Sequence, residues 1–444
     1  MGNYLNKYFG YYDDKDLEQG RKALAGGSVG KGSDLVIESQ SGATFMDIHG
    51  QEFIDCTSQA WSLNIGACRP EIIGVVSEQI KHATHVRSSY GTIPKYILSK
   101  RLTDIAPGNL KKVSFTLHGS IANEGAMKLA MRNNPDGKYF LTPWRGFFGR
   151  TLSTMALSWP HPNNKFLSFM GHTVRFPNAY CYRCPFESSY PTCGLECAKH
   201  LRKMIENSVD GKPIAIFMEP FQAAGGMIDH PKEYLQEIRK ICDEFNILLV
   251  WDEIQTAFGR MGRMFAAELY DVTPDIITFG KAIGGGFPLA GSLHRENLVD
   301  FGEQDHGFTF AHFPVAMAAG VVTLNILKTE NLPKRAEKMG KLFLSGLADL
   351  KNKYEIIGDV RGTGLMIGIE LVKNRKSKEP AIEETGRFIE EATRKGVLFG
   401  RSTFSKMNNV VKIKPPLVIS ESQVKKVLSV FDEVCSIISL SNSH

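Results

Sequence analysis

Uninterrupted apolar runs recur along the chain, and two of them end abruptly in polar residues. Residues 247–251 are followed by Asp252, and residues 276–279 are followed by Gly280, Lys281 and a glycine-rich turn. Apolar runs of this length are typical of strands that are buried on both faces, as in a parallel sheet covered by helices. Residues 214–218 show the same pattern, and residues 111–116 are also expected to form a strand. The sequence therefore predicts an α/β fold with a mostly parallel central sheet.

Near the two ends of the chain, apolar and polar residues alternate in periodic patterns. Alternating apolar positions over 35–54, with a turn at His49-Gly50, predict short antiparallel strands. Beyond a boundary near 331–333, the pattern predicts helices over 335–353, 383–395 and 421–438, with strands inside 357–372. We therefore expect three segments: an arm and small sheet (1–60) that belong to a small domain, a large domain (61–330), and the C-terminal part of the small domain (331–444).

Asp252 and Lys281 carry the candidate chemistry. In open sheets of this kind, ligands lie outside the carboxyl ends of the strands, so both side chains are expected in one crevice. A carboxylate and an amine placed in this way suit pyridoxal 5'-phosphate: the amine forms a Schiff base with the cofactor aldehyde, and the acid keeps the pyridine nitrogen protonated. The alternative is a solvated aspartate at a strand end and a surface lysine in a glycine-rich loop.

Three segments resemble the signature segments of the class III pyridoxal-phosphate-dependent aminotransferases, which include ornithine, 4-aminobutyrate and ω-amine transaminases. These segments are WDEIQTAFGRMGRMFA, PDIITFGKAIGGGFPLA and FTFAHFPVAMAAG. The resemblance implies a fold type I transferase, with a large cofactor-binding domain and a smaller α/β domain. It also implies that Lys281 and Asp252 are catalytic and that Gln255 contacts the cofactor.

Two further segments match the family with departures. Gly119-Ser120 opens a predicted helix whose N-terminus suits a phosphate, and the family places its phosphate-binding motif here, although Leu117, His118 and Ile121 replace the usual residues. At 143–146 the family has an aromatic residue followed by His-Gly. The resemblance implies that Trp144 stacks on the cofactor ring and that Arg145 replaces the histidine.

The substrate positions differ from those of the ornithine-type members. Lys412 takes the place of the arginine that usually grips a substrate carboxylate, and Ala224 takes the place of that arginine's glutamate partner. Lys and Arg are not equivalent in a bidentate site. Trp61 is either a wall of the substrate pocket or a core residue. Arg145 either grips an acidic substrate group or contacts the protein. Thr309 corresponds to the threonine that reaches the cofactor phosphate of the neighbouring subunit, which implies a homodimer.

Charge and cysteine content limit the partners and the location that we expect for this protein. The net charge of +6 is not gathered into a long basic run, so we expect no nucleic acid and no membrane as partners. The first residues lack an apolar segment of signal-peptide length. Because we therefore expect no export signal, the eight cysteines indicate a protein of the reducing cytoplasm. Four of them form a C-x2-C-x8-C-x3-C pattern that resembles metal-ligand spacing. We expect these to be structural thiols and no metal, with a bound metal as the alternative. They are Cys181, Cys184, Cys193 and Cys197.

The resemblance implies an aminotransferase that moves an amino group from an amine or an ω- or β-amino acid to a keto acid. A pyridoxal-phosphate lyase acting on phosphorylated or phosphonate amines, or an amino acid racemase, is the alternative. The three reactions share their first steps, and the altered carboxylate-binding positions keep the alternative open. A catalytically inactive homologue is a third possibility, which the presence of both Lys281 and Asp252 disfavours.

Overall fold

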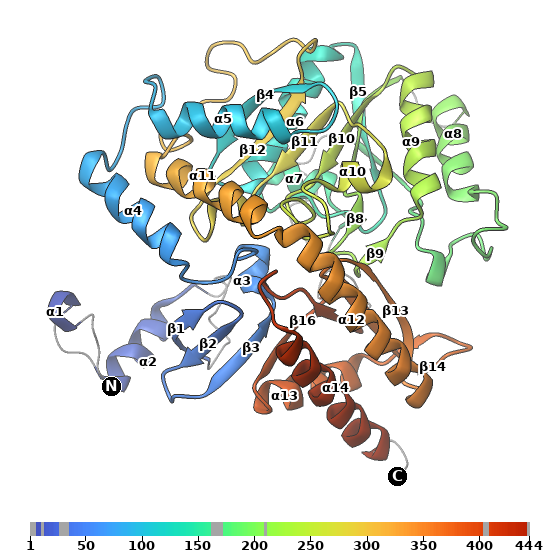
Figure 1. Cartoon of the computed structure of the whole chain (residues 1–444). Helices are drawn as coiled ribbons and strands as arrows, with labels where there is room; N and C mark the ends of the chain where they lie inside the picture. The colour runs from blue at the N-terminus through green and yellow to red at the C-terminus, as the bar shows by residue number, and fades with distance from the viewer. Residues whose placement is uncertain are drawn as a thin grey trace.

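The computed structural model describes residues 6–9, 13–25, 35–160, 172–207, 211–402 and 408–441. Two large β-sheets, each covered by helices, form most of this part of the molecule (Figure 1). Among the helices that the structure describes, none combines the length and apolar character that a membrane span requires.

The first sheet has seven strands, and its central strands hold the predicted site residues. From β11 to β6 the neighbouring strands pair in parallel, whereas β12 is antiparallel to both of its neighbours. The residues of β10 and β11 are almost all buried, which agrees with their uninterrupted apolar sequence. In spatial order the strands are β4 (Leu110–Thr116), β12 (Ala290–Arg295), β11 (Ile276–Phe279), β10 (Leu248–Asp252), β7 (Lys212–Met218), β5 (Gly137–Pro143) and β6 (Thr173–Phe176).

Amphipathic helices cover this sheet. In α9 (Lys232–Glu244) the buried side chains recur at helical spacing, so one stripe of the helix packs on β10 and the rest faces solvent. Helix α6 (Gly119–Asn133) packs against β12, β11 and β4. The remaining helices of this part are α4 (Pro70–His82), α5 (Ile93–Ile105), α7 (Leu152–Leu157), α8 (Glu196–Asn207), α10 (Ala266–Tyr270) and α11 (Pro314–Thr329), with 3₁₀ turns η2 (Cys181–Arg183) and η3 (Lys281–Gly284).

The second sheet combines strands from both ends of the chain. Its N-terminal strands are joined to its C-terminal strands by parallel pairing of β3 with β16, which aligns Ile54 with Val397. In spatial order the strands are β1 (Ile37–Ser41), β2 (Thr44–Asp47), β3 (Glu52–Cys56), β16 (Val397–Arg401), β17 (Val410–Ile413), β14 (Met366–Asn374) and β13 (Ile357–Thr363), with β15 (Glu379–Pro380) beside β14. The structure thus brings the predicted N-terminal small sheet and the C-terminal region into one unit.

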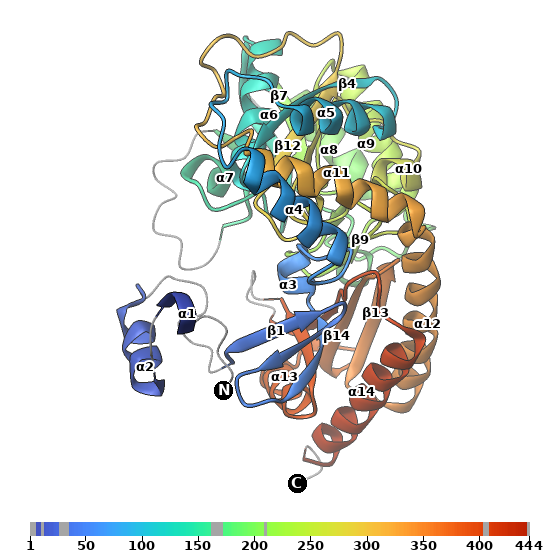
Figure 2. The same cartoon turned by 60° about the vertical axis from the view of Figure 1, so that its left-hand side comes forward.

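Helix α12 (Leu332–Lys353) connects the two sheets. It contacts α11 at one end and lies on β13 beside α14 (Glu421–Ser441), and the turned view shows it passing from one sheet to the other (Figure 2). Helix α13 (Ile382–Arg394) completes this layer. The observed limits of α12, α13 and α14 are close to the predicted ones. The short elements are α1 (Asn6–Phe9), α2 (Asp14–Ala23), α3 (Ser58–Trp61) and the hairpin β8 (Phe221–Gln222) with β9 (Ile228–Asp229). The domain limits at 60 and 330 stay a prediction.

Candidate active site

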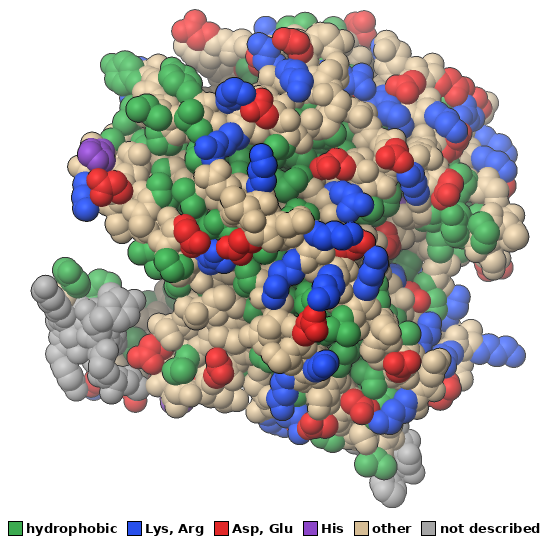
Figure 3. Space-filling model, viewed as in Figure 1, with side chains coloured by type: hydrophobic (Ala, Val, Ile, Leu, Met, Phe, Trp, Pro, Cys, Tyr) green, Lys and Arg blue, Asp and Glu red, His purple; other side chains and the backbone are tan. Residues whose placement is uncertain are grey.

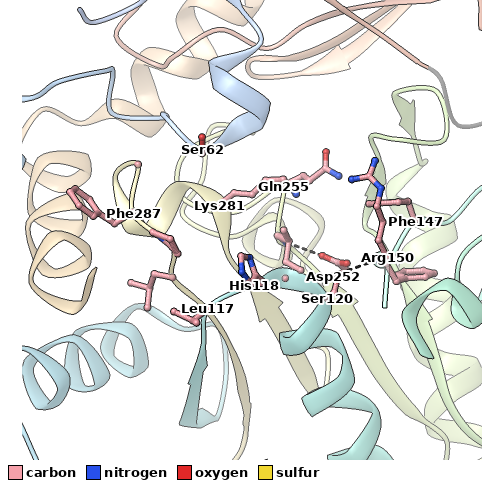
Figure 4. A pocket seen from close by; sticks show the side chains of 17 residues that line it. Ser62, Leu117, His118, Ser120, Phe147, Arg150, Asp252, Gln255, Lys281 and Phe287 are labelled. Carbon is pink, nitrogen blue, oxygen red and sulfur yellow. Dashed lines mark hydrogen bonds between the residues drawn. The ribbon is translucent and has the colours of Figure 1, made fainter. Parts of the chain in front are cut away.

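A cavity of about 450 Å³ opens where several strands of the first sheet end. Asp252 is the last residue of β10, and Lys281 follows β11, its parallel neighbour. The close view shows Lys281, Gln255 and Asp252 facing the same space, with Ser120 at the start of α6 below them (Figure 4). The strand order therefore brings together residues that lie far apart in the sequence, as the crevice rule predicts.

Asp252 is buried and held by two hydrogen bonds. The Nδ2 of Asn123 donates to Oδ2 at 2.8 Å, and the amide of Ile254 donates to Oδ1 at 2.9 Å. Asn123 is itself oriented, because Thr278 Oγ1 donates to its Oδ1 at 2.6 Å. Burial raises the pKa of Asp252 to about 6, although the Asn123 hydrogen bond lowers it. A cation bound beside this carboxylate would lower its pKa again and keep it ionised.

Lys281 begins η3 with a left-handed backbone, at φ +48°. Such a conformation is unfavourable for a residue with a side chain and is concentrated at functional sites. Burial lowers the pKa of Lys281, and Asp252 and Glu219 act in the opposite direction. A lowered pKa increases the fraction of neutral amine, which is the form that attacks a carbonyl carbon or accepts a proton.

The start of α6 contributes Gly119 and Ser120 to the cavity. Ser120 Oγ accepts a hydrogen bond from the amide of Arg150 at 3.1 Å, so a second loop is fixed at the same place. A side chain at position 119 would bring its Cβ to 2.7 Å from Cδ1 of Ile254, so Ile254 would have to shift. Free amides at a helix start, with a cationic side chain nearby, favour a phosphate group.

Gln255 lines the cavity from the segment after β10. Its Oε1 is buried and has no hydrogen-bond partner among the described residues. A buried, unsatisfied amide oxygen is costly, so a ligand with a donor group at this place would remove that cost.

The structure brings Phe147 to the cavity, and Trp144 is not among the residues that line it. Trp144 packs on Trp159, with ring centroids 6.0 Å apart. The amide of Phe147 donates to Glu219 Oε1 at 2.9 Å, which ties this loop to the end of β7. The sequence offers residues 147–149, Phe-Phe-Gly, as a second aromatic residue before a glycine, but it does not decide between the two segments. Ring stacking by Trp144 stays a prediction.

Arg145 lies at the contact between the two sheets. Its guanidinium carbon is 5.0 Å from the ring centroid of Tyr180, and burial lowers its pKa. The OH of Tyr180 donates to Glu370 on β14. Arg145 is also absent from the cavity lining, so its predicted role as a substrate contact stays a prediction.

Trp61 and Lys412 come together near Lys281. The ammonium nitrogens of Lys281 and Lys412 lie 5.8 Å and 5.7 Å from the ring centroid of Trp61. Lys412 is buried, and this burial lowers its pKa to about 8, while Glu219 raises it. The structure therefore places two of the three predicted substrate residues next to the candidate catalytic lysine.

Thr309 lies in the loop between β12 and α11 and is exposed. It does not line this chain's own cavity. The structure describes a single chain, so the predicted contact of Thr309 with a neighbouring subunit stays a prediction.

The four clustered cysteines line a small pocket beside α8, outside the candidate active site. Burial raises the pKa of Cys181 to about 11 and that of Cys197 to about 12. Within the described ranges, no group of three or more His, Cys, Asp or Glu side chains is arranged to hold a metal ion. The expectation that these cysteines are structural thiols stays a prediction.

A lysine and an aspartate at neighbouring strand ends, with a helix N-terminus beside them, define a pyridoxal-phosphate-dependent enzyme of fold type I. The chain belongs to the class III aminotransferase family, whose model matches residues 28–435. It is 34% identical over 395 residues to a leucine/methionine racemase of Thermococcus litoralis, covering 87% of each chain. It is 32% identical to an acetylornithine aminotransferase of Methanosarcina acetivorans, covering 90% of this chain and 91% of the relative.

A solved structure supports the same assignment. An amine transaminase from an uncultivated Pseudomonas species, in its pyridoxal-phosphate-bound form, superposes with a TM-score of 0.86 at 28% identity. The match covers 94% of this chain and 98% of that chain. The family and this likeness identify pyridoxal 5'-phosphate as the cofactor.

Proposed function

We propose that this protein transfers an amino group from an amino acid or amine donor to a keto acid, with Lys281 as the amine that bonds to the cofactor aldehyde. The observation that carries the proposal is that Asp252 and Lys281 line one cavity, at the ends of two adjacent parallel strands. Family membership supports amino-group transfer as the reaction.

The residues around the cavity fit the cofactor. The unsatisfied Oε1 of Gln255 needs a donor from a ligand, and the buried carboxylate of Asp252 needs a cation. Asp252 would hold a proton on the ring nitrogen, Phe147 would cover the ring, and Gly119 and Ser120 would bind the phosphate. When bound, the cofactor supplies an electron-accepting ring.

Lys281 would move the proton in this site. Its pKa is lowered by burial, so the side chain can take a proton from a substrate carbon and return it elsewhere. The hydrogen bond from the amide of Phe147 to Glu219 would hold Phe147 in its place at the cavity. Trp61 and Lys412 lie next to Lys281, which supports a role in substrate binding for both.

The proposed assembly is a homodimer in which Thr309 reaches the cofactor phosphate of the neighbouring subunit. Exposed apolar side chains gather over α4, α5 and the loop that holds Thr309, and Figure 3 shows apolar side chains on this face. An exposed apolar patch of this kind is a typical subunit interface. Its members include Ile73, Ile80, Tyr90, Ile93, Tyr96, Ile97 and Phe310. We also propose a cytoplasmic location, which the eight free cysteines support.

Racemisation is the second candidate function. It is favoured by the 34% identity to the leucine/methionine racemase and by Ala224, which stands in place of the glutamate of ornithine-type members. The carbonyl oxygen of Ala224 accepts a hydrogen bond from Ser402 at 2.9 Å, so the backbone at this position is fixed while the side chain offers no charge. The lyase alternative has no comparable observation in its favour.

A half-reaction without a keto acid distinguishes these reactions. The purified holoenzyme is mixed in heavy water with leucine, 5-aminovalerate, a diamine or an aminophosphonate. We expect one-for-one conversion of the cofactor to its amine form, reversed by adding a keto acid. Loss of chirality with deuterium uptake, while the cofactor stays in the aldehyde form, would establish a racemase instead. Continuing release of ammonia or phosphate would establish a lyase.

Phe147→Ala is expected to weaken cofactor binding about 10-fold, because the variant loses the aromatic surface against the ring. Trp144→Ala is the matched control, since Trp144 packs on Trp159 and lies outside the cavity lining. Dialysis followed by titration with cofactor measures both dissociation constants. A loss in Trp144→Ala with none in Phe147→Ala would assign the ring contact to Trp144.

A further inference from the structure

The loop between β12 and α11 is attached to one face of helix α6. The carbonyl oxygen of Asp305 accepts a hydrogen bond from Nζ of Lys128 at 2.7 Å, and its carboxylate pairs with Arg132 at 3.1 Å. At the start of the loop, Val299 exchanges two hydrogen bonds with the side chain of Asn133, at 2.8 Å and 3.0 Å. These polar groups are exposed, and exposed polar pairs contribute little stability. Polar contacts alone therefore do not explain how the loop is held.

His306 lies at the centre of an aromatic cluster in this loop. Its ring stacks on Phe301, with centroids 5.1 Å apart, and meets Phe308 edge-on at 4.9 Å. Both ring nitrogens are buried, and neither has a hydrogen-bond partner among the described residues. Burial and the nearby Lys128 lower the pKa of His306 to about 4, although Glu124 raises it. At neutral pH the ring is therefore uncharged, and it acts by packing and not by hydrogen bonding.

Gly125 provides the space for this ring on α6. It lies inside the helix, where glycine is less favourable than alanine. Its φ is not in the left-handed region, so the backbone does not require a glycine here. A Cβ at position 125 would lie 2.6 Å from Nε2 and 3.0 Å from Cδ2 of His306. The ring of His306 thus packs against the helix where a side chain would otherwise stand.

Helix α6 is connected to two cofactor contacts of different kinds. Its first residues, Gly119 and Ser120, line the cavity of their own chain. The loop attached to its middle holds Thr309, which is exposed and follows His306 after only two intervening residues. A displacement of the His306 ring would therefore move the hydroxyl of Thr309 as well.

We propose that His306 is a positioning residue whose packing in the space at Gly125 places Thr309 against the cofactor phosphate of the neighbouring subunit. This inference rests on the proposed homodimer and on the proposed role of Thr309 in it. His306 itself would touch no part of the cofactor. Its loss would leave Thr309 outside hydrogen-bond distance of the phosphate, and the effect would appear in the cavity of the other subunit.

Mixed dimers test this inference, because they separate the two subunits. Subunits with different affinity tags are co-expressed, and the mixed dimer is isolated through both tags. One subunit carries Lys281→Ala, so that only the other, the reporting subunit, develops the absorbance of the covalently bound cofactor. After dialysis, pyridoxal 5'-phosphate is titrated back, and the dissociation constant of the reporting subunit is read from this absorbance.

His306→Ala in the Lys281→Ala subunit is expected to weaken cofactor binding in the reporting subunit about 10-fold, the effect of one hydrogen bond to a charged group. The same substitution in the reporting subunit should change its dissociation constant by less than about two-fold, because the intact loop of its partner still contacts its phosphate. A purely structural role would weaken the subunit that carries the substitution. An unchanged affinity in both arrangements, or an equal or larger loss in the second, would overturn the inference.

His230→Ala is the matched control, since His230 is also a buried histidine and packs on an aromatic ring, 5.3 Å from the Tyr234 centroid. It should leave the affinity unchanged in both arrangements, and a 10-fold loss across the dimer from this control would also overturn the inference. Gly125→Ala, whose Cβ would displace the ring, should reproduce the loss across the dimer, so that a His306→Ala protein that does not fold leaves the inference testable.

The oligomeric state separates this inference from the proposals on which it rests. A protein that stays monomeric would overturn the proposed homodimer and this inference together. A dimer with unchanged affinity in both arrangements would overturn this inference alone. A dimer that shows the loss across subunits but transfers no amino group would support this inference and contradict the proposed reaction alone.

Discussion

Lys281→Ala is expected to abolish amino-group transfer, with a loss of at least about 10⁴ in kcat. The variant lacks both the amine that bonds to the cofactor and the base that moves the substrate proton. Among the described residues that line the cavity, no other lysine is present that could replace Lys281. The visible absorbance of the covalently bound cofactor should disappear at the same time. Stopped-flow half-reactions and absorbance spectra measure the two effects separately.

The control for this variant is Lys232→Ala. Lys232 is a partly exposed lysine of the same part of the molecule that pairs with Asp271, and its loss should leave kcat and the spectrum unchanged. A Lys281→Ala protein that kept its absorbance and turned over substrate would refute the assignment of Lys281.

Asp252→Asn is expected to lower kcat roughly 10²- to 10³-fold. The amide has nearly the shape of the carboxylate and can still accept the hydrogen bond from Ile254. It carries no negative charge, however, so it cannot hold a proton on the cofactor ring nitrogen. The loss should appear in kcat more than in KM, because the negative charge acts on the electrons that move during the reaction and not on the groups by which the substrate is bound.

Asp275→Asn provides a comparison within the same sheet. Asp275 is also buried, but it binds Arg239 and the amide of Leu249, away from the cavity. Its substitution should lower the melting temperature and leave the kcat of the folded enzyme unchanged. If both variants lost only stability, Asp252 would have no part in the reaction.

The fold followed from local patterns to a large extent. The uninterrupted apolar runs predicted β10, β11 and β7, because strands buried on both faces need apolar residues at every position. The amphipathic periods predicted α12, α13 and α14 to within a few residues. The crevice rule then placed Asp252 and Lys281 together, since adjacent parallel strands end at the same edge of the sheet.

Local sequence patterns could not predict the conformation of the loop after β5. Residues 143–146 and 147–149 both present an aromatic residue before a glycine. Which ring faces the cavity depends on the path of the loop, and the hydrogen bond from Phe147 to Glu219 fixes that path. Glu219 is 72 residues away along the chain, so no local pattern contains the information.

The sequence by itself determined the layered α/β architecture, the family and the central pair of catalytic candidates, because these depend on periodicity and on short motifs. The tertiary structure decided which side chains from distant segments lie beside Lys281. Trp61 follows β3 and Lys412 lies on β17, and the two meet because β16 pairs with both strands. Such contacts are set by sheet register and packing between distant segments, which the order of residues does not reveal before the chain has folded.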